Sequence, residues 1–411
     1  MSLSLESRAL ILLTGLNVLD YLDRYLIASL ATPVKLELGL SDKAFGFLGT
    51  AFFLVYFLSS PIFGHLGDRW GRTRLMAGGA VLWSLATSLT YWVASYPALL
   101  LARGLVGIGE ASFGTLAPAY FSDILPFSRR PRSLGIFYMA IPVGTALAFL
   151  IGGLVSGRWG WRPAFLLAGL PGLALAFFIS GLNRDRERFP APAAQAPPEG
   201  KLAANLSLWR IPSFRRVTLG YGMITFAMGG LAFWMSRYLE VVKGLSHAQA
   251  SYLLFGTIGG AGALGTLAGG LLASRLARGT KVAPLWISGL GVALALPLAG
   301  LTIFAPQPAL YIPGLVGAVF LLFLNPGILT AVVVSVAGPA RRARAVALNI
   351  VIIHLVGDVP APFLIGWASD IWGLKWAAAV TLPALVAAVA LILAALPYLE
   401  ADLRQAGEAD K

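Results

Sequence analysis

The stretch Gly64-His65-Leu66-Gly67-Asp68-Arg69-Trp70-Gly71-Arg72-Thr73-Arg74 decides the fold of this chain. An apolar run precedes it at residues 45–62, and another follows it at residues 75–93. Each run is long enough to cross roughly 30 Å of hydrocarbon as a helix. The stretch is therefore predicted to be a tight loop between two membrane helices. Its glycines let the helix ends approach each other, and its arginines favour the cytoplasm and the phosphate headgroups.

Asp68 is the one acid in this basic loop, so we expect it to have a partner. The unpaired N–H groups and the dipole at the N-terminus of a helix would suit its charge. The alternative is an ordinary basic turn that only sets the topology of the chain.

The composition of the 411 residues points to a membrane protein, because 58% are hydrophobic and only 12% are charged. Soluble domains carry roughly 25% charged residues. A net charge of +13 would suggest nucleic acid in a soluble chain, but here the positive charge lies in short loops, so no nucleic-acid partner is expected. The chain has no cysteine and three histidines, and we expect neither a metal site nor a cofactor.

Twelve apolar segments follow one another along the chain, which predicts an all-α membrane protein with twelve transmembrane helices. We expect no cleavable signal before the first of them. The segments lie at 9–32, 44–66, 74–94, 97–122, 132–156, 163–182, 216–239, 247–274, 282–304, 309–336, 344–370 and 376–398.

The series is interrupted once, at 184–215, by a run of five charged residues followed by a Pro/Ala-rich stretch. Such a composition is typical of a solvated linker. We therefore expect an N-terminal six-helix bundle at 1–183, a cytoplasmic linker at 184–215, a C-terminal six-helix bundle at 216–399 and a cytoplasmic tail at 400–411.

The distribution of lysine and arginine predicts the orientation. If both termini and every even-numbered loop are cytoplasmic, 22 of the 31 basic residues lie on that side. Positive residues collect in cytoplasmic loops, so both termini are expected there. The protein is predicted to be an integral multi-pass protein of a bacterial inner membrane.

The two halves repeat each other in sequence. Gly39-Leu40-Ser41 recurs as Gly244-Leu245-Ser246, and a Gly-x-x-Ser-x-x-Trp-Gly pattern occurs at both 153–160 and 366–373. The 64–74 loop returns in degraded form at 270–278, where Ser274 replaces the acid. Because both halves start on the same side, the repeat is parallel, which is typical of transporters whose halves move about a midplane site.

Charged residues within the apolar segments are expensive and usually functional. At 100° per residue, Asn17, Asp20, Tyr21 and Arg24 form one polar stripe on the first helix, with Asp23 at its flank. Asp20 and Arg24 stand four positions apart in the favourable acid-first order. The stripe is expected to face protein or a water-filled cavity, although a static pair that only fixes the helix is the alternative.

Two further pairs lie at membrane depth. Arg103 and Glu110 are seven residues apart on the fourth helix and share a face, and His354 and Asp358 are four apart on the eleventh. The first pair could also be static, and the histidine could be a hydrogen-bonded core residue. The functional hypothesis is that substrate competes with a carboxylate for an arginine, so that the carboxylate takes up or releases a proton. The predicted substrate and proton-coupling residues are Asp20, Asp23, Arg24, Arg103, Glu110, His354 and Asp358.

The pattern Gly-x-Leu-x-Asp-Arg-x-Gly-Arg-x-Arg at 64–74 resembles the loop 2–3 signature of the major facilitator superfamily, whose fold is two pseudo-symmetric six-helix bundles. Asp123-Ile124-Leu125-Pro126-Phe127-Ser128-Arg129-Arg130 is similar to the family's acid-x-x-Pro-x-x-x-Arg element. The resemblance implies that Asp68 meets the start of helix 11 near Arg344 in one of two alternating states. It implies a conformational gate of Gly64, Asp68, Arg69, Gly71, Arg72, Asp123, Arg130 and Arg344.

Three segments, at 17–25, 103–112 and 354–370, resemble the spinster family of lipid transporters. That resemblance implies a secondary active, proton-coupled or facilitative alternating-access transporter of an amphipathic lipid such as a lysophospholipid or a sphingosine-1-phosphate-like molecule. Helix 5 departs from the antiporter pattern, because Thr145 to Phe149 follow Gly144, which argues against drug efflux. The expected partners are this lipid-like or small anionic substrate, protons and membrane lipids, with the protein a monomer.

Other functions remain open at this stage. A proton-coupled transporter of small organic anions is the main alternative. An enzyme is not expected, because the sequence has neither Gly-x-Ser-x-Gly nor His-Glu-x-x-His. The parallel repeat argues against a channel, and a sensor on the same fold remains possible.

Overall fold

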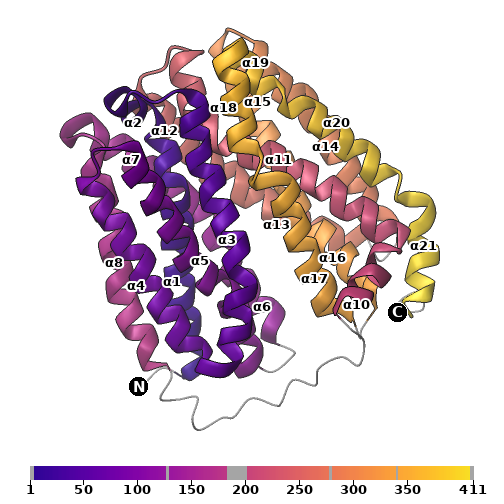
Figure 1. Cartoon of the computed structure of the whole chain (residues 1–411). Coiled ribbons are helices and arrows are strands. Elements are labelled where there is room, and N and C mark those ends of the chain that lie inside the picture. Colours follow the sequence, from indigo (N-terminus) through magenta and orange to yellow (C-terminus); the bar gives the residue numbers. More distant parts are fainter. Residues whose placement is uncertain (1–3, 126–128, 183–200, 277–279, 339–340, 408–411) are drawn as a thin grey trace. The chain divides into compact units, whose positions relative to one another are not determined.

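The computed structural model describes residues 4–125, 129–182, 201–276, 280–338 and 341–407. Most residues in these ranges are helical, and the ranges contain no strand (Figure 1). The predicted all-α membrane fold is therefore confirmed. By their internal contacts the residues form two compact units, Met1–Ala194 with Met235–Gly259, and Gln195–Trp234 with Gly260–Lys411.

The first unit contains most of the helices of the N-terminal half. Short helices cap or extend several of the long ones, such as α2 after α1 and α6 before α7. The helices are α1 (Leu5–Ser29), α2 (Ala31–Leu38), α3 (Asp42–Trp70), α4 (Arg72–Leu89), η1 (Thr90–Trp92), α5 (Tyr96–Ile124), α6 (Arg130–Tyr138), α7 (Ala140–Trp159), α8 (Arg162–Gly181) and α12 (His247–Gly256).

The remaining helices belong wholly or mostly to the second unit. Helix α11 begins there and ends in the first unit, and the π-helical segment η3 crosses the boundary at Gly259. These helices are α10 (Lys201–Trp209), α11 (Pro212–Val241), η3 (Thr257–Gly262), α13 (Ala263–Leu276), α14 (Ala283–Phe304), α15 (Pro308–Phe323), α16 (Asn325–Ala337), α17 (Arg342–Ile353), η5 (His354–Asp358), α18 (Ala361–Trp372), α19 (Leu374–Ala379), α20 (Thr381–Leu393) and α21 (Leu396–Gln405).

Ten helices in the described ranges are long and apolar enough to cross a membrane. They correspond to ten of the twelve predicted segments. The other two segments are also helical, as α1 and α4. Helix α1 carries Asp20, Asp23 and Arg24 within its apolar run, and α4 begins with two arginines among only 18 residues. Charged residues lower the mean hydropathy of a span, and here those of α1 are buried rather than exposed.

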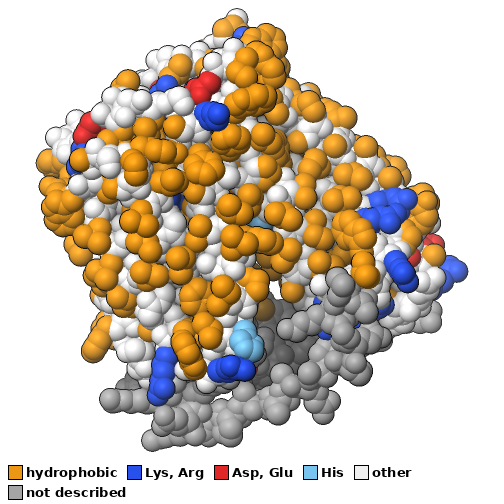
Figure 2. Space-filling model, in the orientation of Figure 1, with side chains coloured by type: hydrophobic (Ala, Val, Ile, Leu, Met, Phe, Trp, Pro, Cys, Tyr) orange, Lys and Arg blue, Asp and Glu red, His pale blue; other side chains and the backbone are white. Residues whose placement is uncertain are grey.

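Large apolar side chains cover the outside of each unit, as Figure 2 shows for one face. Phe177 is 74% exposed and Leu101 is 66% exposed. Soluble proteins rarely expose apolar patches of this extent, whereas a lipid-facing surface requires them. The protein is an integral multi-pass membrane protein.

Helices α4 and α5 touch through their backbones, which fixes the position of the two helices that carry Thr87 and Glu110. A Cβ atom on Gly109 would lie 2.6 Å from the carbonyl oxygen of Gly79, and one on Gly79 would lie 2.8 Å from the carbonyl oxygen of Gly109. Small residues allow this approach between membrane helices.

The region predicted as linker and the predicted tail both contain ordered helix. Helix α10 lies within 184–215 and contributes the buried Leu208 to the core of the second unit, while residues 183–200 lie outside the described part of the chain. Helix α21 carries Asp402, whose carboxylate accepts hydrogen bonds from the backbone N–H of Ser213, at 2.9 Å, and from its hydroxyl. Asp402 thus satisfies the first turn of α11 from another helix.

Replacing Asp402 with alanine is expected to lower the free energy of unfolding by about 2 kcal/mol, because a buried N–H and hydroxyl lose a charged acceptor. The measurement is the thermal melting midpoint in detergent. Glu400→Ala on the same helix is the matched control, since Glu400 is exposed and its loss should change little. Equal midpoints for the two variants would contradict the capping role.

Candidate functional site

The polar stripe of α1 is buried inside the first unit. Asp20 is 2% exposed, Asp23 is 1% exposed and Arg24 is 8% exposed. Asn17, one turn earlier, donates a hydrogen bond from Nδ2 to the carbonyl oxygen of Phe137 at 2.9 Å. The stripe therefore faces protein, which is one of the two environments expected from its residue types.

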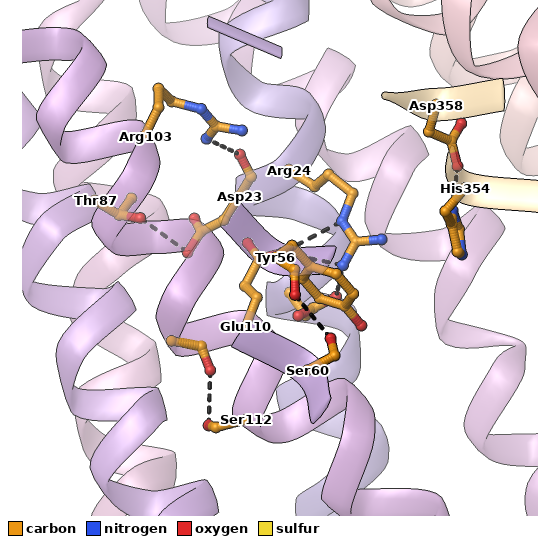
Figure 3. Close-up of polar contacts among 12 residues, drawn as sticks. Asp23, Arg24, Tyr56, Ser60, Thr87, Arg103, Glu110, Ser112, His354 and Asp358 are labelled. Atoms are coloured by element: carbon orange, nitrogen blue, oxygen red, sulfur yellow. Dashed lines mark hydrogen bonds and ion pairs between the residues drawn. The ribbon is translucent and has the colours of Figure 1, made fainter. Parts of the chain in front are cut away.

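Arg24 joins α1 to α5 through two carboxylates. Its Nη2 lies 3.0 Å from Asp20 Oδ2 and 3.0 Å from Glu110 Oε2, and its Nε lies 3.3 Å from the same Glu110 oxygen (Figure 3). Glu110 is fully buried. One guanidinium thus serves as the counter-ion of two acids on different helices.

Arg103 and Asp23 form the other side of the cluster. Arg103 Nη1 donates to the backbone carbonyl oxygen of Asp23 at 3.4 Å, and the Asp23 carboxylate accepts from Thr87 Oγ1 of α4 at 3.1 Å (Figure 3). Arg103 and Glu110 share a face of α5, as their spacing predicts, but each contacts α1. The hydrogen bond of Arg103 goes to Asp23, and the ion pair of Glu110 is with Arg24.

Aromatic rings surround both guanidinium groups. The Cζ of Arg24 lies 4.6 Å from the ring centroid of Tyr21, 5.3 Å from that of Tyr56 and 5.4 Å from that of Phe52. The Cζ of Arg103 lies 4.7 Å from the Phe52 centroid. Such distances are within the range of cation–π attraction, so Phe52 links the two arginines.

The charges of this cluster do not balance when all five groups are ionised. Three carboxylates face two guanidinium groups, which leaves a formal charge of −1. Asp20 Oδ1, Asp23 Oδ1 and Glu110 Oε1 are also buried and lack a hydrogen-bond partner. Buried unpaired charge is costly, so one added proton would make the cluster neutral and satisfy its charge balance.

Sequence reasoning missed Thr87, Phe52 and Tyr56. Thr87 is one hydroxyl in an apolar helix, and the aromatic residues belong to an ordinary apolar run of α3. Their periodicity carried no distinguishing signal, because only the packing of α3, α4 and α5 on α1 turns them toward the charges.

Thr87→Val is expected to lower the free energy of unfolding by about 1–2 kcal/mol, because it removes a partner of the buried Asp23 carboxylate at nearly constant volume. Thr87→Ser keeps the hydroxyl and should melt close to the wild type. The test compares the melting midpoints of both variants in detergent. A loss in the serine variant as large as in the valine variant would show that packing, not the hydrogen bond, matters.

His354 and Asp358 form a second pair, which lies in the second unit. They bound the π-helical segment η5, and His354 Nδ1 lies 2.5 Å from Asp358 Oδ2 (Figure 3). Asp358 packs against Gly229 of α11, where a Cβ would lie 2.1 Å from Asp358 Oδ1. π-Helical turns are rare and occur frequently at functional sites. The sequence predicted the pair but not the local change of helix type.

The predicted gate is described in part. Gly71, with φ of +88°, forms the turn between α3 and α4, and Arg72 Nη1 pairs with Asp123 Oδ1 at 2.8 Å. Arg69 is exposed, and Gly64 lies in the last part of α3.

The remaining members of the predicted gate are Asp68, Arg130 and Arg344. The side chains of Asp68 and Arg130 lie outside the described part of the structure, and Arg344 belongs to α17 of the second unit. The contact between Asp68 and the region of Arg344 therefore stays a prediction. Among the described residues, no three histidine, aspartate or glutamate side chains are grouped to hold a metal ion.

Comparison with known proteins supports a transporter family. Residues 13–357 match the Major Facilitator Superfamily. Protein spinster homolog 1 of Rattus norvegicus is 33% identical over 392 residues, covering 89% of this chain and 73% of that protein. The Homo sapiens protein of the same name is 32% identical over 387 residues, covering 88% of this chain and 72% of that protein.

Solved structures share the fold. A bacterial homolog to the human lysosomal transporter Spinster, in an inward-facing and unoccupied conformation, matches with a TM-score of 0.84 and 24% identity, covering 98% of this chain and 99% of that one. A D-xylose-proton symporter matches with a TM-score of 0.74 and 17% identity, covering 94% and 97%. The family is one of transporters and not of enzymes, as the sequence predicted. The chain belongs to the major facilitator superfamily and, within it, to the spinster family.

Proposed function

We propose that this transporter moves an amphipathic lipid-like anion by alternating access and couples the movement to protons. The observation that carries the proposal is the sharing of one guanidinium, that of Arg24, between Asp20 and Glu110 inside an aromatic surround. Because the Arg24 guanidinium is already shared by two carboxylates, an anionic substrate group can compete with them for it.

The coupling step follows from the charge balance. When an anionic head group binds Arg24, Glu110 loses its two hydrogen bonds from that side chain. An ionised Glu110 without a partner would be a stranded charge in a solvent-excluded place, so it takes up a proton. Release of the substrate returns Arg24 to Glu110, and the proton leaves. Asp23 and Arg103 are proposed to form the second part of this relay.

The aromatic surround supports a lipid-like substrate over a small polar one. Tyr21, Phe52 and Tyr56 place apolar surface beside the Arg24 guanidinium. A ligand with an anionic head and an adjoining hydrocarbon tail would satisfy both surfaces, whereas a small dicarboxylate would satisfy only the charge. The pair of His354 and Asp358 is proposed as the contribution of the second unit to substrate or proton binding.

The gate and orientation complete the proposal. The 64–74 loop and Asp123 are proposed to lie at the cytoplasmic face, with both termini on the same side of a bacterial inner membrane. Contact of Asp68 with the start of α17 near Arg344 would then favour one of the two access states. The protein is proposed to act as a monomer.

The test is transport in liposomes containing the purified protein. Labelled lysophospholipid is followed with and without an imposed pH gradient, in parallel with a labelled short dicarboxylate. Lysophospholipid movement that the gradient accelerates supports the proposal. Dicarboxylate uptake without lipid movement, in folded protein, would replace it with the small-anion function.

Arg103→Ala tests whether the buried cations of the cluster bind the anionic head group of the substrate. It removes a buried cation and the contact with Asp23, so we expect lipid transport to fall at least about tenfold. Arg129→Ala is the control, because Arg129 is 67% exposed and its pair with Glu6 lies at the surface.

A further inference from the structure

A second charged network lies at the end of α3 that is remote from the 64–74 loop. Asp42, the first residue of α3, pairs with Lys35 of α2 and with Arg237 of α11, whose Nε lies 3.2 Å from Asp42 Oδ1. Arg237 Nη1 also donates to Thr32 Oγ1 at 3.4 Å. The end of α11 is therefore fastened to α2 and α3 within the first unit.

His247 is the first residue of α12, and its imidazole ring contacts both α11 and α7. Its Nδ1 lies 2.9 Å from Glu240 Oε1 of α11, and its Nε2 lies 3.4 Å from the carbonyl oxygen of Gly152 in α7. The hydroxyl of Ser236 lies 3.2 Å from the same Glu240 oxygen and 3.3 Å from the carbonyl oxygen of Ser29 in α1. These contacts connect α1, α7, α11 and α12.

The two ring nitrogens of His247 face two oxygen atoms that accept hydrogen bonds, one of the Glu240 carboxylate and one of the Gly152 backbone carbonyl. A neutral imidazole has one N–H and satisfies one of them, whereas an imidazolium has two and satisfies both. Histidine is the side chain that ordinarily changes charge between pH 5 and 8. Its side chain is 19% exposed, so protons exchange with the solution.

Other charged residues near the His247 ring contact other partners or lie farther from the ring along their helices. Arg237 is bound to Asp42, and Lys243 lies over the ring of Tyr238 at 5.5 Å. Helix α12 has no other charged residue, and the one charged residue of α7 is Arg158, six positions beyond Gly152. Among the contacts described for the imidazole, Glu240 is the charged one.

We propose that His247 is a proton-operated latch. As an imidazolium it ties α12 to Glu240 and to α7, and so holds this end of the first unit closed. Loss of the proton removes one of the two hydrogen bonds and the ion pair, which loosens the start of α12 against α11 and α7. The proposal rests on the alternating-access transport proposed above, and it adds that the start of α12 separates from α7 during that cycle.

Helix α2 is attached to the start of α8 through Glu37, and the charge of Glu37 does not change over the same pH range. Glu37 accepts hydrogen bonds from the Arg162 guanidinium and from Trp161 Nε1, the latter at 2.6 Å. The Arg162 guanidinium holds the pKa of Glu37 below its usual range. Glu37 is therefore ionised throughout pH 5.5–8.5, and a pH response in this window cannot come from α2 losing its anchor.

The absence of cysteine in the sequence allows a direct distance measurement. Spin labels are attached to the double variant Leu36→Cys on α2 and Tyr252→Cys on α12, whose side chains are 76% and 44% exposed. Distances are measured by double electron–electron resonance at pH 5.5 and pH 8.5 without substrate. We expect one short distance at pH 5.5, and a longer second distance at pH 8.5 with an open-to-closed ratio about tenfold higher.

Two substitutions separate charge from shape. His247→Asn removes the charge and should give the longer distance at both pH values, whereas His247→Arg keeps a charge with several donors and should give the short one. His65→Asn is the matched control, because His65 is exposed on α3 and should leave the response unchanged.

The proposal is overturned if the wild-type ratio does not change with pH, or if His247→Asn responds to pH as the wild type does. Since the distances are read without substrate, a failure of lipid transport leaves this result standing. A ratio that ignores pH in protein that still transports lipid would reject the latch alone.

Discussion

Glu110→Gln is expected to abolish the acceleration of transport by a pH gradient while leaving the helices in place. Glutamine keeps an oxygen that can accept from Arg24, but it can neither bind nor release a proton. Glu110 is fully buried and holds two of the three short contacts of Arg24. Loss of a charge-assisted contact of this kind is worth about 1.5–3 kcal/mol, so gradient-driven flux should fall at least roughly tenfold.

The measurement compares gradient-driven flux with exchange of labelled for unlabelled lysophospholipid at equal pH. Exchange needs no net proton movement, so it should survive in Glu110→Gln even where gradient-driven flux is lost. Glu6→Gln is the control, because Glu6 forms an exposed pair with Arg129 and should transport as the wild type. Full gradient-driven flux in Glu110→Gln would remove Glu110 from the proton relay and leave a lipid facilitator.

Gly109→Ala is expected to give the largest loss of stability. The added Cβ would lie 2.6 Å from the Gly79 carbonyl oxygen, 2.7 Å from Trp83 Cβ and 2.8 Å from Trp83 N, so backbone as well as side chain must move. Overpacking of a close-packed interior costs about 1–3 kcal/mol and occasionally more. Because α4 and α5 carry Thr87 and Glu110, separating them should also reduce transport.

Gly104→Ala on the same helix is the matched control. Its Cβ would meet only Val55 Cγ2, at 4.0 Å, so alanine fits without strain and slightly favours the helix. Melting midpoints in detergent should fall for Gly109→Ala and stay level or rise for Gly104→Ala. Similar midpoints in both variants would mean that α4 and α5 can separate at little cost.

Hydropathy and charge were sufficient to predict the helices. The positions of most long helices, the all-α class and the superfamily follow from apolar runs of membrane length and from the 64–74 loop. In a membrane the backbone must satisfy its own hydrogen bonds, so an apolar run of about 20 residues has one structure available to it. This is a local property, which is why a single sequence reveals it for segments such as α5 or α14.

Two short helices, one within the predicted linker and one reaching into the predicted tail, were not predicted from hydropathy. Helix α10 and helix α21 are amphipathic and short, so their hydropathy resembles that of a solvated segment. Their order comes from burial of Leu208 and from Asp402 capping α11, which are contacts with residues far along the chain.

The sequence by itself determined which residues carry charge into the membrane, because Asp20, Asp23, Arg24, Arg103 and Glu110 interrupt otherwise apolar helices. Only the tertiary structure decided how they pair. Arg24 serves both Asp20, four residues away, and Glu110, 86 residues away.

The physical reason is that hydrophobicity marks a span but not the rotation of its helix or the identity of its neighbours. Those depend on which surfaces fit together, such as the backbone contact of Gly79 with Gly109. Packing of α11 and α12 against α2, α3 and α7 likewise brings Arg237 and Glu240 into ion pairs that their positions in the sequence do not reveal. The sequence therefore predicts which residues carry charge into the membrane, while helix packing decides which residues they pair with.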